Sequence, residues 1–287
     1  MKRISIIGLG LIGGSLALAL KKISTLKFEV VGFSRRSETT TKAKDGGIID
    51  RAAHDLTSAV AEADLVIIAT PVMTIKDILA SISRHLSPEC VVTDTGSTKV
   101  EVMQWAEEYL PPGVSFIGGH PMAGKETSGI DEADPALFAG CVYCLTPAPR
   151  AAQKAVQGVT ALVESIGARP FFIDAALHDD LVAGVSHIPM LLSAAFVTTT
   201  TKSRSWPEMA KLAAGGYRDF SRLASGNPEM NRDICLTNQE KISKWLDRYI
   251  EELKVYRHLL AKDGNGLCQR LAQAKEAREK WLQEEKP

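Results

Sequence analysis

Neither sign of charge is in excess in this sequence. Its 287 residues include 34 basic and 34 acidic side chains, so the formal net charge at pH 7 is zero. A general nucleic-acid binder needs a basic excess to displace counterions from the phosphate backbone, and this balance argues against that class. Aromatic residues make up only 6% of the chain, but hydrophobic residues reach 45%, which suffices for a sizeable core and excludes global disorder.

Cysteine is scarce, and its number is odd. The five residues are Cys90, Cys141, Cys144, Cys235 and Cys268, which do not form the even, dense set of a secreted disulfide scaffold. Cys141 and Cys144 have the spacing of a redox or metal pair. In a predicted strand, however, their side chains point to opposite faces, so we interpret them as core packing and expect no metal site. A reducing cytoplasm is the expected location.

The apolar N-terminal stretch is too short for a membrane span. Residues 4–20 are interrupted by four glycines and followed by Lys21-Lys22, where a signal peptide would have a small-residue cleavage site. The stretch also falls short of the roughly 20 apolar residues that a spanning helix requires. We therefore expect neither export nor a membrane partner.

The first half of the chain alternates short β-branched runs with amphipathic stretches. Helical patterns occupy residues 75–85, 99–109 and 151–166. The predicted strands are residues 4–7, 29–33, 65–69, 91–94, 115–119, 142–145 and 171–173. Strands that are apolar throughout and separated by helices indicate a parallel sheet covered on both faces. This is the α/β, doubly wound architecture of nucleotide-binding domains.

The second half has helical periodicity and no convincing strand. Apolar residues follow helical spacing from Leu181 onward, and Pro189 lies inside the run. Proline removes the hydrogen bond to the carbonyl of Val185 and should bend the helix. Residues 241–280 are rich in good helix formers. We therefore expect a Rossmann-type dinucleotide-binding domain at residues 1–174 and an all-helical domain at residues 175–287.

A glycine-rich loop follows the first predicted strand and opens a helix. It reads Gly8-Leu9-Gly10-Leu11-Ile12-Gly13, and glycines at these spacings permit a tight turn, close approach to a pyrophosphate and close helix–strand packing. The helix N-terminus offers free N–H groups to the phosphates. The predicted cofactor contacts here and after the third strand are Gly8, Gly10, Leu11, Ile12, Gly13, Thr70 and Pro71.

The second predicted strand ends at Ser34-Arg35-Arg36. An NAD site usually has an acidic residue here for the ribose 2′-hydroxyl, whereas arginine accommodates a 2′-phosphate; Glu29 falls too early, within the strand. A hydroxyl with two guanidinium groups suits a phosphate dianion. The segment therefore favours NADP, with NAD still possible. The alternative is that the two arginines only solvate a loop.

Two strand ends carry candidate catalytic residues. His120 ends the apolar run Phe116-Ile117-Gly118-Gly119, and ligands of open parallel sheets bind beyond the carboxyl ends of strands. A histidine there can accept a proton from an alcohol while hydride leaves for the cofactor, or it can simply bond a backbone carbonyl. Ser97 also follows a strand and opens a helix, so it either caps that helix or presents its hydroxyl to the site.

Three residues of the second half are candidate substrate contacts. His187 lies beside Pro189 and, taken alone, is more typical of a core histidine. Arg218 and Arg222 are four residues apart after Gly215-Gly216 and share one helix face. They can clamp a carboxylate or solvate the surface, and composition does not decide between the two.

Several motifs, taken together and in order, resemble the prephenate/arogenate dehydrogenase family of tyrosine biosynthesis. The resemblance extends from Met1 at least to the helix after Asn238, and the histidine–proline and Arg-Asp-x-x-Arg motifs are its most specific parts. The matching segments are residues 8–15, 94–99, 118–124, 178–179, 186–189, 216–222, 227–230 and 232–233.

The resemblance implies a role for each candidate. The family histidine that matches His120 polarises or deprotonates the ring hydroxyl, and the serine that matches Ser97 hydrogen-bonds this hydroxyl and the histidine. The arginine that matches Arg222 holds the carboxylate that leaves as carbon dioxide. Residues matching three further positions lie near the substrate side chain. These positions are His187, Arg218 and Glu126. The resemblance also implies a homodimer formed through the helical domains.

Two departures from the family pattern concern the site. Asn231 stands where many relatives have tryptophan, and Lys125-Glu126 replaces Thr-Glu or Thr-Ala versions. We hypothesise that Glu126 pairs with the ammonium group of arogenate, which prephenate lacks. The alternatives are another Rossmann plus helical-domain reductase, of the β-hydroxyacid dehydrogenase or imine reductase type, which would use a lysine of the helical domain, and a cofactor-sensing protein without chemistry.

Overall fold

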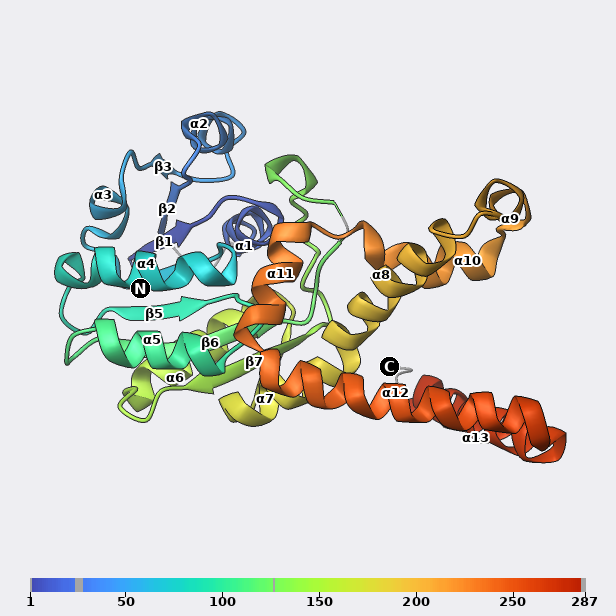
Figure 1. Cartoon of the computed structure of the whole chain (residues 1–287). Coiled ribbons are helices and arrows are strands. Elements are labelled where there is room, and N and C mark those ends of the chain that lie inside the picture. Colours follow the sequence, from blue (N-terminus) through green and yellow to red (C-terminus); the bar gives the residue numbers. More distant parts are fainter. Residues whose placement is uncertain (1, 24–27, 126, 285–287) are drawn as a thin grey trace. The chain divides into compact units, whose positions relative to one another are not determined.

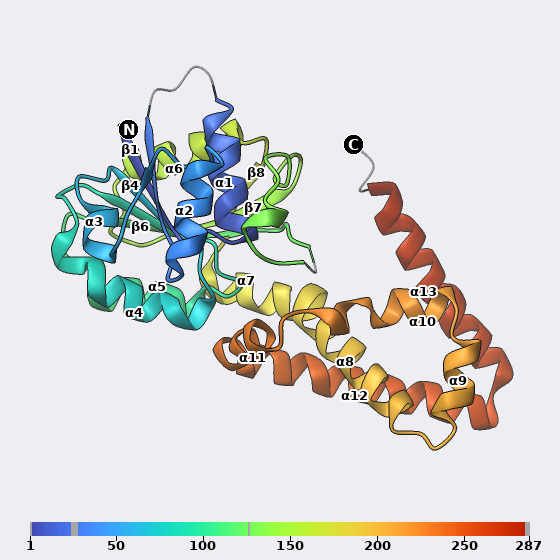
Figure 2. The ribbon, with the colours of Figure 1, turned by 90° about the horizontal axis from the view of Figure 1, so that it is seen from above.

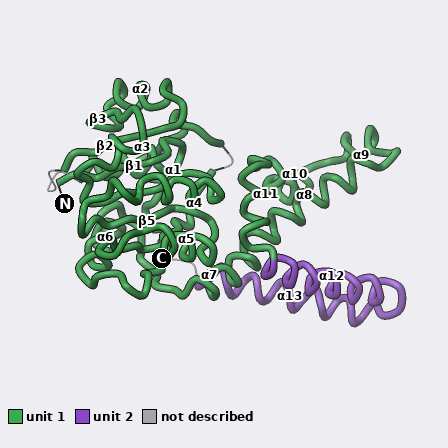
Figure 3. The backbone as a smooth tube through the Cα atoms, turned by 60° about the vertical axis from the view of Figure 1, so that its left-hand side comes forward, with its two compact units in different colours: residues 1–239 green, residues 240–287 purple. Residues whose placement is uncertain are grey.

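The computed structural model describes residues 2–23, 28–125 and 127–284. Within these ranges the chain divides into two compact units, residues 1–239 and residues 240–287 (Figure 3). The first unit contains an eight-stranded sheet followed by helices, and the second contains a pair of long helices. Each unit is described separately.

The sheet has the strand order β3-β2-β1-β4-β5-β6-β7-β8, which is doubly wound about β1, as predicted. The strand bounds are β1 Arg3–Ile7, β2 Glu29–Phe33, β3 Arg51–Ala52, β4 Leu65–Ile68, β5 Val91–Asp94, β6 Ser115–Pro121, β7 Val142–Pro147 and β8 Arg169–Phe172. The sequence pattern did not predict the two-residue strand β3. The order reverses between β1 and β4, and in open α/β sheets such a switch point opens the crevice where ligands bind.

One expectation, that all strands run parallel, is wrong for the last two. β7 pairs antiparallel to β6, and β8 then runs parallel to β7. Parallel neighbours need a crossover connection, usually a helix. The connection from β6 to β7 has only the short 3₁₀ turn Ile130–Glu132 among its described residues. Without a crossover helix, the chain returns in the opposite direction.

Helices cover both faces of the sheet, and each face has its own hydrophobic core (Figure 2). On one face Leu16 and Ala43 belong to a core that also includes Val159. The helices on that face are α1 (Leu11–Lys21), α2 (Ser37–Asp45) and α6 (Gln153–Ser165). On the other face the core includes Leu79 and Trp105. The helices there are α3 (Leu56–Val60), α4 (Val72–Ile82) and α5 (Val100–Tyr109). Burial on both faces explains why the central strands are apolar throughout.

Beyond β8 the described residues contain only helical segments (Figure 1). In the first unit these are α7 (Ala175–Val182), a π-helical turn (Ala183–His187), α8 (Ile188–Thr201), α9 (Trp206–Leu212), α10 (Gly215–Ser221), the 3₁₀ turn Arg222–Ser225 and α11 (Pro228–Thr237). The second unit consists of α12 (Gln239–Lys262) and α13 (Gly264–Glu284), which an Arg270–Glu252 ion pair of 2.6 Å joins.

The π-helical turn is how the helix accommodates Pro189. The backbone N–H of Ile188 donates to the carbonyl of Ala183, five residues back, and Pro189 then falls in the first turn of α8. Proline is well tolerated there because the first N–H groups of a helix have no partner within it. π turns of this kind are frequent at functional sites.

Candidate active site

The glycine loop packs so tightly that two of its positions admit no side chain. Gly8 has a φ of +100°, and a Cβ there would lie 2.4 Å from the carbonyl oxygen of Ala69. A Cβ on Gly13 would lie 1.9 Å from the carbonyl oxygen of Gly8. A Cβ on Gly10, in contrast, would meet nothing within 4 Å. Gly8 and Gly13 therefore close the turn, and Gly10 leaves an open surface for a ligand to approach.

The loop leads into the N-terminus of α1 at the switch point of the sheet. Gly10 is the N-cap residue, and it makes no side-chain cap hydrogen bond to the first N–H groups of the helix. These groups and the positive end of the helix dipole can bind a phosphate. Thr70 and Pro71 follow β4, the strand beside β1, and the Thr70 side chain lies against Gly8. The structure thus brings the predicted loop contacts together with Thr70.

The end of β2 carries two exposed cations. Arg35 and Arg36 are exposed, and the backbone N–H of Ser34 donates to the buried hydroxyl of Thr40 at 3.0 Å. Glu29, at the start of β2, is paired with other residues: its carboxylate lies 2.6 Å from the Arg3 guanidinium and 3.4 Å from that of Arg51. Glu29 is thus already paired, and it lies at the opposite end of β2 from Ser34.

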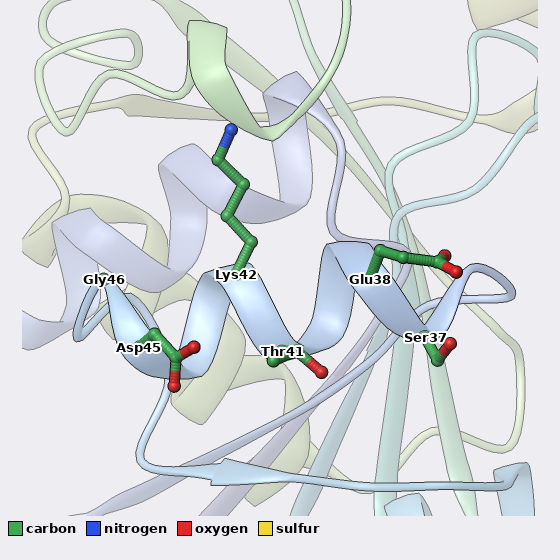
Figure 4. Close-up of a pocket in the computed structure, with 6 residues that line it drawn as sticks. All are labelled: Ser37, Glu38, Thr41, Lys42, Asp45 and Gly46. Atoms are coloured by element: carbon green, nitrogen blue, oxygen red, sulfur yellow. The ribbon is translucent and has the colours of Figure 1, made fainter.

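A shallow hollow runs along α2, directly after this segment (Figure 4). Its lining comes from one helix and the glycine after it: Ser37, Glu38, Thr41, Lys42, Asp45 and Gly46. The Lys42 ammonium lies 2.5 Å from the Asp131 carboxylate, so it is already paired. Both partners are exposed, and we assign no chemistry to this hollow.

A buried carboxylate connects the loop after β5 with strand β6. Asp94 is fully buried and accepts hydrogen bonds from the backbone N–H of Gly96 at 2.7 Å and of Gly119 at 3.0 Å. It also pairs with the ammonium of Lys99, which is equally buried. A buried ion pair is tolerated when further hydrogen bonds satisfy both partners. This pair holds the loop of Ser97 against the strand that carries His120.

A cavity of about 540 Å³ lies beside Ser97 and His120. Four predicted site residues line it: Ser97, His120, His187 and Arg222. Most of the remaining lining is apolar, including Met122, Val185, Met190, Leu223, Met230 and Ile234. An apolar cavity with a few convergent polar groups is typical of small-molecule sites, and this one could hold a ring with its carboxylate at Arg222.

Ser97 lines this cavity instead of capping α5. The N-cap position of α5 is Lys99, and its side chain makes no capping bond. The cap comes from α7: the carboxylate of Asp179 accepts from the backbone N–H of Lys99 at 2.7 Å and of Val100 at 2.9 Å. This arrangement leaves the Ser97 hydroxyl available to the cavity.

His120 makes a hydrogen bond to a second histidine. Its Nδ1 lies 2.9 Å from Nε2 of His178, and Nδ1 of His178 lies 2.7 Å from the Asp179 carboxylate. Burial, together with the nearby His178, Lys99 and His187, lowers the pKa of His120 well below its ordinary value of 6.5. His120 is therefore a neutral imidazole at neutral pH, the form that can accept a proton.

His187 is buried at the cavity wall. Asn238 places its Nδ2 2.7 Å from the carbonyl oxygen of Asp179 and 3.3 Å from Nδ1 of His187. The Nε2 atom of His187 has no hydrogen-bond partner among the described residues. Burial lowers the pKa of His187 to about 4, so at neutral pH an uncharged imidazole nitrogen is available to a ligand.

The remaining predicted contacts have different positions. Arg222 begins the 3₁₀ turn after α10 and lines the cavity, whereas Arg218 is exposed on α10 and is not among the lining residues. Glu126 lies outside the described residues. Its neighbour Lys125 and Asn231 both line the cavity. The Lys125 ammonium lies 3.5 Å from the Asp134 carboxylate.

Sequence reasoning missed the roles of Asp94, Lys99 and the His178–Asp179 pair. The pair was noted only as a family motif, although His178 and Asp179 lie, next to Asp180, within a helical run that is mostly apolar. They are 1% exposed, and buried polar residues need partners. That signal was available in the sequence, but it did not say which residues the partners would be.

Two family models match the chain. Residues 16–171 match the model described as the nucleotide-binding domain of prephenate dehydrogenase, and residues 174–273 match its dimerization domain. The chain belongs to the prephenate dehydrogenase family. The predicted family is thereby confirmed, as are the Rossmann-type fold of the first part, its nucleotide-binding character and the dimerisation character of the helical part.

Individual family members match over nearly the whole chain. The prephenate dehydrogenase of Bacillus subtilis is 37% identical over 275 residues, which is 95% of this chain and 74% of that protein. The crystal structure of Aquifex aeolicus prephenate dehydrogenase in complex with hydroxyphenyl propionate and NAD+ superposes with a TM-score of 0.91 at 31% identity over 98% of each chain. Synechocystis arogenate dehydrogenase superposes with a TM-score of 0.83 at 32% identity, covering 97% of this chain and 99% of that one.

Proposed function

We propose that this chain catalyses the NAD(P)-dependent oxidative decarboxylation of prephenate, arogenate or both, giving 4-hydroxyphenylpyruvate or tyrosine in tyrosine biosynthesis. The observation that carries the proposal is one apolar cavity that combines a neutral histidine, His120, with a guanidinium group, Arg222. The substrates have a ring hydroxyl at one end and a ring carboxylate at the other. We infer that His120 meets the ring hydroxyl and Arg222 the ring carboxylate.

In the proposed mechanism the protein moves one proton and holds one carboxylate. His120 accepts the proton of the ring hydroxyl, with Ser97 bonded to the same oxygen, as the hydrogen on the carbinol carbon leaves as hydride. The bound nicotinamide supplies the hydride acceptor. Arg222 holds the carboxylate until its carbon–carbon bond breaks. The electron pair of that bond flows through the ring to the oxygen, which takes back the proton from His120, and the ring becomes aromatic.

The fit of the chain to a dinucleotide rests on the open face at Gly10 and the uncapped N-terminus of α1. Gly8, Leu11, Ile12 and Gly13 would hold the pyrophosphate together with Gly10, and Thr70 and Pro71 would be further contacts of the cofactor. We propose NADP as the preferred cofactor and NAD as a possible one. Ser34, Arg35 and Arg36 support this preference, because two exposed guanidinium groups at the end of β2 suit a 2′-phosphate.

The other end of the substrate is proposed to lie near His187. Its uncharged Nε2 has no hydrogen-bond partner among the described residues, so it can bond the side chain of the substrate. We also propose Arg218 and Glu126 as contacts of that side chain. Glu126 would favour the ammonium group of arogenate by charge.

We propose a cytoplasmic homodimer that pairs through its helical part. Within the second unit, exposed apolar side chains recur along both helices: Ile250, Leu253, Val255, Leu260, Leu271 and Trp281. Exposed apolar surface of this kind marks protein–protein contacts. A dimer of this part agrees with the dimerization model that matches residues 174–273. No nucleic-acid or membrane partner is proposed.

One helical run in the described residues, Ala175–Thr201, is long and apolar enough to cross a membrane by length and composition. It contains three buried polar residues, His178, Asp179 and His187. His178 bonds His120, Asp179 accepts from the backbone N–H of Lys99, and His187 lies within hydrogen-bond distance of Asn238. Only 28% of its apolar window is buried, but ionisable residues are rare in membrane-spanning segments, and these three support the proposal of a protein without a membrane partner.

The reductase alternative is less well supported by the cavity. Enzymes of that kind would use a lysine of the helical domain, and no lysine of residues 175–239 is among the described cavity-lining residues. The test of the proposed function is stoichiometry. We expect one carbon dioxide released per nicotinamide reduced from prephenate or arogenate, whereas reduction of the nicotinamide without carbon dioxide would contradict the proposal.

A further inference from the structure

We propose that His178 and Asp179 fix the tautomer of His120, so that its Nε2 faces the cavity as the proton acceptor. Both are positioning residues, because they act through His120 and need no contact with substrate. The part of this inference that concerns catalysis rests on the proposed function. The part that concerns the tautomer rests on hydrogen-bond geometry alone.

The chain of hydrogen bonds starts at Asp179. Its carboxylate accepts from three N–H groups: the backbone N–H of Lys99 at 2.7 Å, the backbone N–H of Val100 at 2.9 Å and Nδ1 of His178 at 2.7 Å. An ionised carboxylate has no hydrogen to donate. The contact with His178 therefore requires that the hydrogen lie on Nδ1 of His178.

The second contact follows from the first. In a neutral imidazole with its hydrogen on Nδ1, Nε2 has a lone pair and can only accept. Nε2 of His178 lies 2.9 Å from Nδ1 of His120, so this contact requires that Nδ1 of His120 be the donor. Neutral His120 then has no hydrogen on Nε2, and this second ring nitrogen is the one left for the cavity.

The same chain meets the charge that forms when His120 takes up a proton. The other basic groups that face His120 are His178 of α7, His187 of the π turn and Lys99 before α5. Lys99 is itself neutralised by Asp94. The carboxylate of Asp179 is connected to His120 through the His178 ring and so stabilises the imidazolium, as in other carboxylate–histidine pairs.

The arrangement connects the base to helix docking. His120 lies in β6, whereas His178 and Asp179 lie in α7, 58 and 59 positions further along the chain. Asp179 caps α5 with the same carboxylate that orients His178. The tautomer of the base is therefore fixed only when α7 is packed against the N-terminus of α5.

Long-range ¹H–¹⁵N NMR of the full protein, labelled with ¹⁵N-histidine, tests the tautomer directly. We expect His120 at neutral pH to carry its hydrogen on Nδ1 and to show an unprotonated Nε2, with assignment from the spectrum of His120→Gln. A hydrogen on Nε2 of His120 would overturn the proposal, because it would mean that His178 is the donor. No substrate is needed, so this result is independent of whether the chain turns over prephenate or arogenate.

A pair of variants at one position tests the effect on catalysis. His178→Gln keeps an acceptor oxygen for Nδ1 of His120, and His178→Leu removes it at similar size. We expect His178→Leu to lower kcat on the order of 100-fold, the range of a general base that is lost or misdirected, with KM nearly unchanged. We expect His178→Gln to recover most of kcat. The exposed His54→Leu is the control for loss of a histidine.

The two variants must first bind cofactor and unfold at the same temperature. Equal losses of kcat in both would overturn the role of the acceptor, as would wild-type kcat in His178→Leu. If both unfold, Asp179→Asn supplies the test. An amide that donates to Nδ1 of His178 reverses the chain, and NMR should then find the hydrogen of His120 on Nε2. An unchanged His120 tautomer in folded Asp179→Asn would contradict the proposal.

Discussion

The hydroxyl of Thr98 lies 2.9 Å from the hydroxyl of Thr237, and both side chains are buried. Thr98 belongs to the loop that carries Ser97, and Thr237 ends α11, 139 positions further along the chain. Thr237 also donates to the carbonyl of Asp233 at 2.8 Å. Its hydrogen is thus used there, and Thr98 must be the donor between the two hydroxyls.

This donor assignment predicts that the two valine substitutions lower the free energy of unfolding by different amounts. Thr237→Val leaves the buried hydrogen of Thr98 without an acceptor, and we expect a loss of about 1–3 kcal/mol in the free energy of unfolding. Thr98→Val leaves Thr237 still bonded to Asp233 and should cost less. The double variant should be more stable than Thr237→Val alone. Urea unfolding of the three variants measures this, and a more damaging Thr98→Val would contradict the assigned donor.

Two glycines of the dinucleotide loop should respond differently to alanine. In Gly13→Ala the new Cβ would lie 1.9 Å from a backbone oxygen, so we expect the loop to be distorted, with a lower melting temperature and loss of cofactor binding. In Gly10→Ala the Cβ meets no protein atom within 4 Å. Stability should then stay at the wild-type level while cofactor affinity falls. Calorimetry and cofactor titration separate the two effects, and a destabilised Gly10→Ala would count against this account of the loop.

Arg35 and Arg36 should decide between the two cofactors. We expect Arg35→Ala/Arg36→Ala to raise KM for NADP at least about tenfold, since each charge-assisted bond to phosphate is worth roughly 1.5–3 kcal/mol, and to leave KM for NAD nearly unchanged. Arg84→Ala, another exposed arginine, is the matched control. An equal change for both cofactors would mean that the two arginines only solvate the loop.

The low pKa of His120 predicts the acid limb of the pH profile. A proton acceptor works only in its neutral form, and burial with nearby basic groups holds the pKa of His120 well below 6.5. We therefore expect kcat/KM to be nearly constant as the pH falls to 6.5 and to decrease only in more acidic solution. The exposed His258→Gln should leave the profile unchanged. A half-maximal point at or above pH 6.5 would show that the base is not in this buried environment.

Local patterns predicted the parts of the fold that depend on neighbouring residues. The bounds of β2 and β5 and the glycine loop after β1 were all predicted from short stretches of sequence. The direction of β7 was not, because it depends on the whole connection from β6. The sequence also placed Ser97 and His120 at strand ends, but it left open whether Ser97 caps α5.

The partners of the site residues could not be predicted, because they are distant in the sequence. The cap of α5 is Asp179, which is 80 positions from Lys99, and no local rule connects these two residues. The same holds for Asn238 and His187, 51 positions apart. Sequence patterns identify such residues as polar within apolar runs, and only the packing of α7 and α11 shows what they bond.

The most direct test of the central claim is reduced-nicotinamide absorbance with purified protein and four substrate–cofactor pairs: prephenate or arogenate, each with NADP or NAD. We predict turnover in at least one pair, faster with NADP, and a loss of on the order of 10²- to 10⁴-fold in His120→Asn with cofactor binding retained. Absence of turnover in all four pairs, from folded protein that binds cofactor, would contradict the account, as would wild-type turnover in His120→Asn.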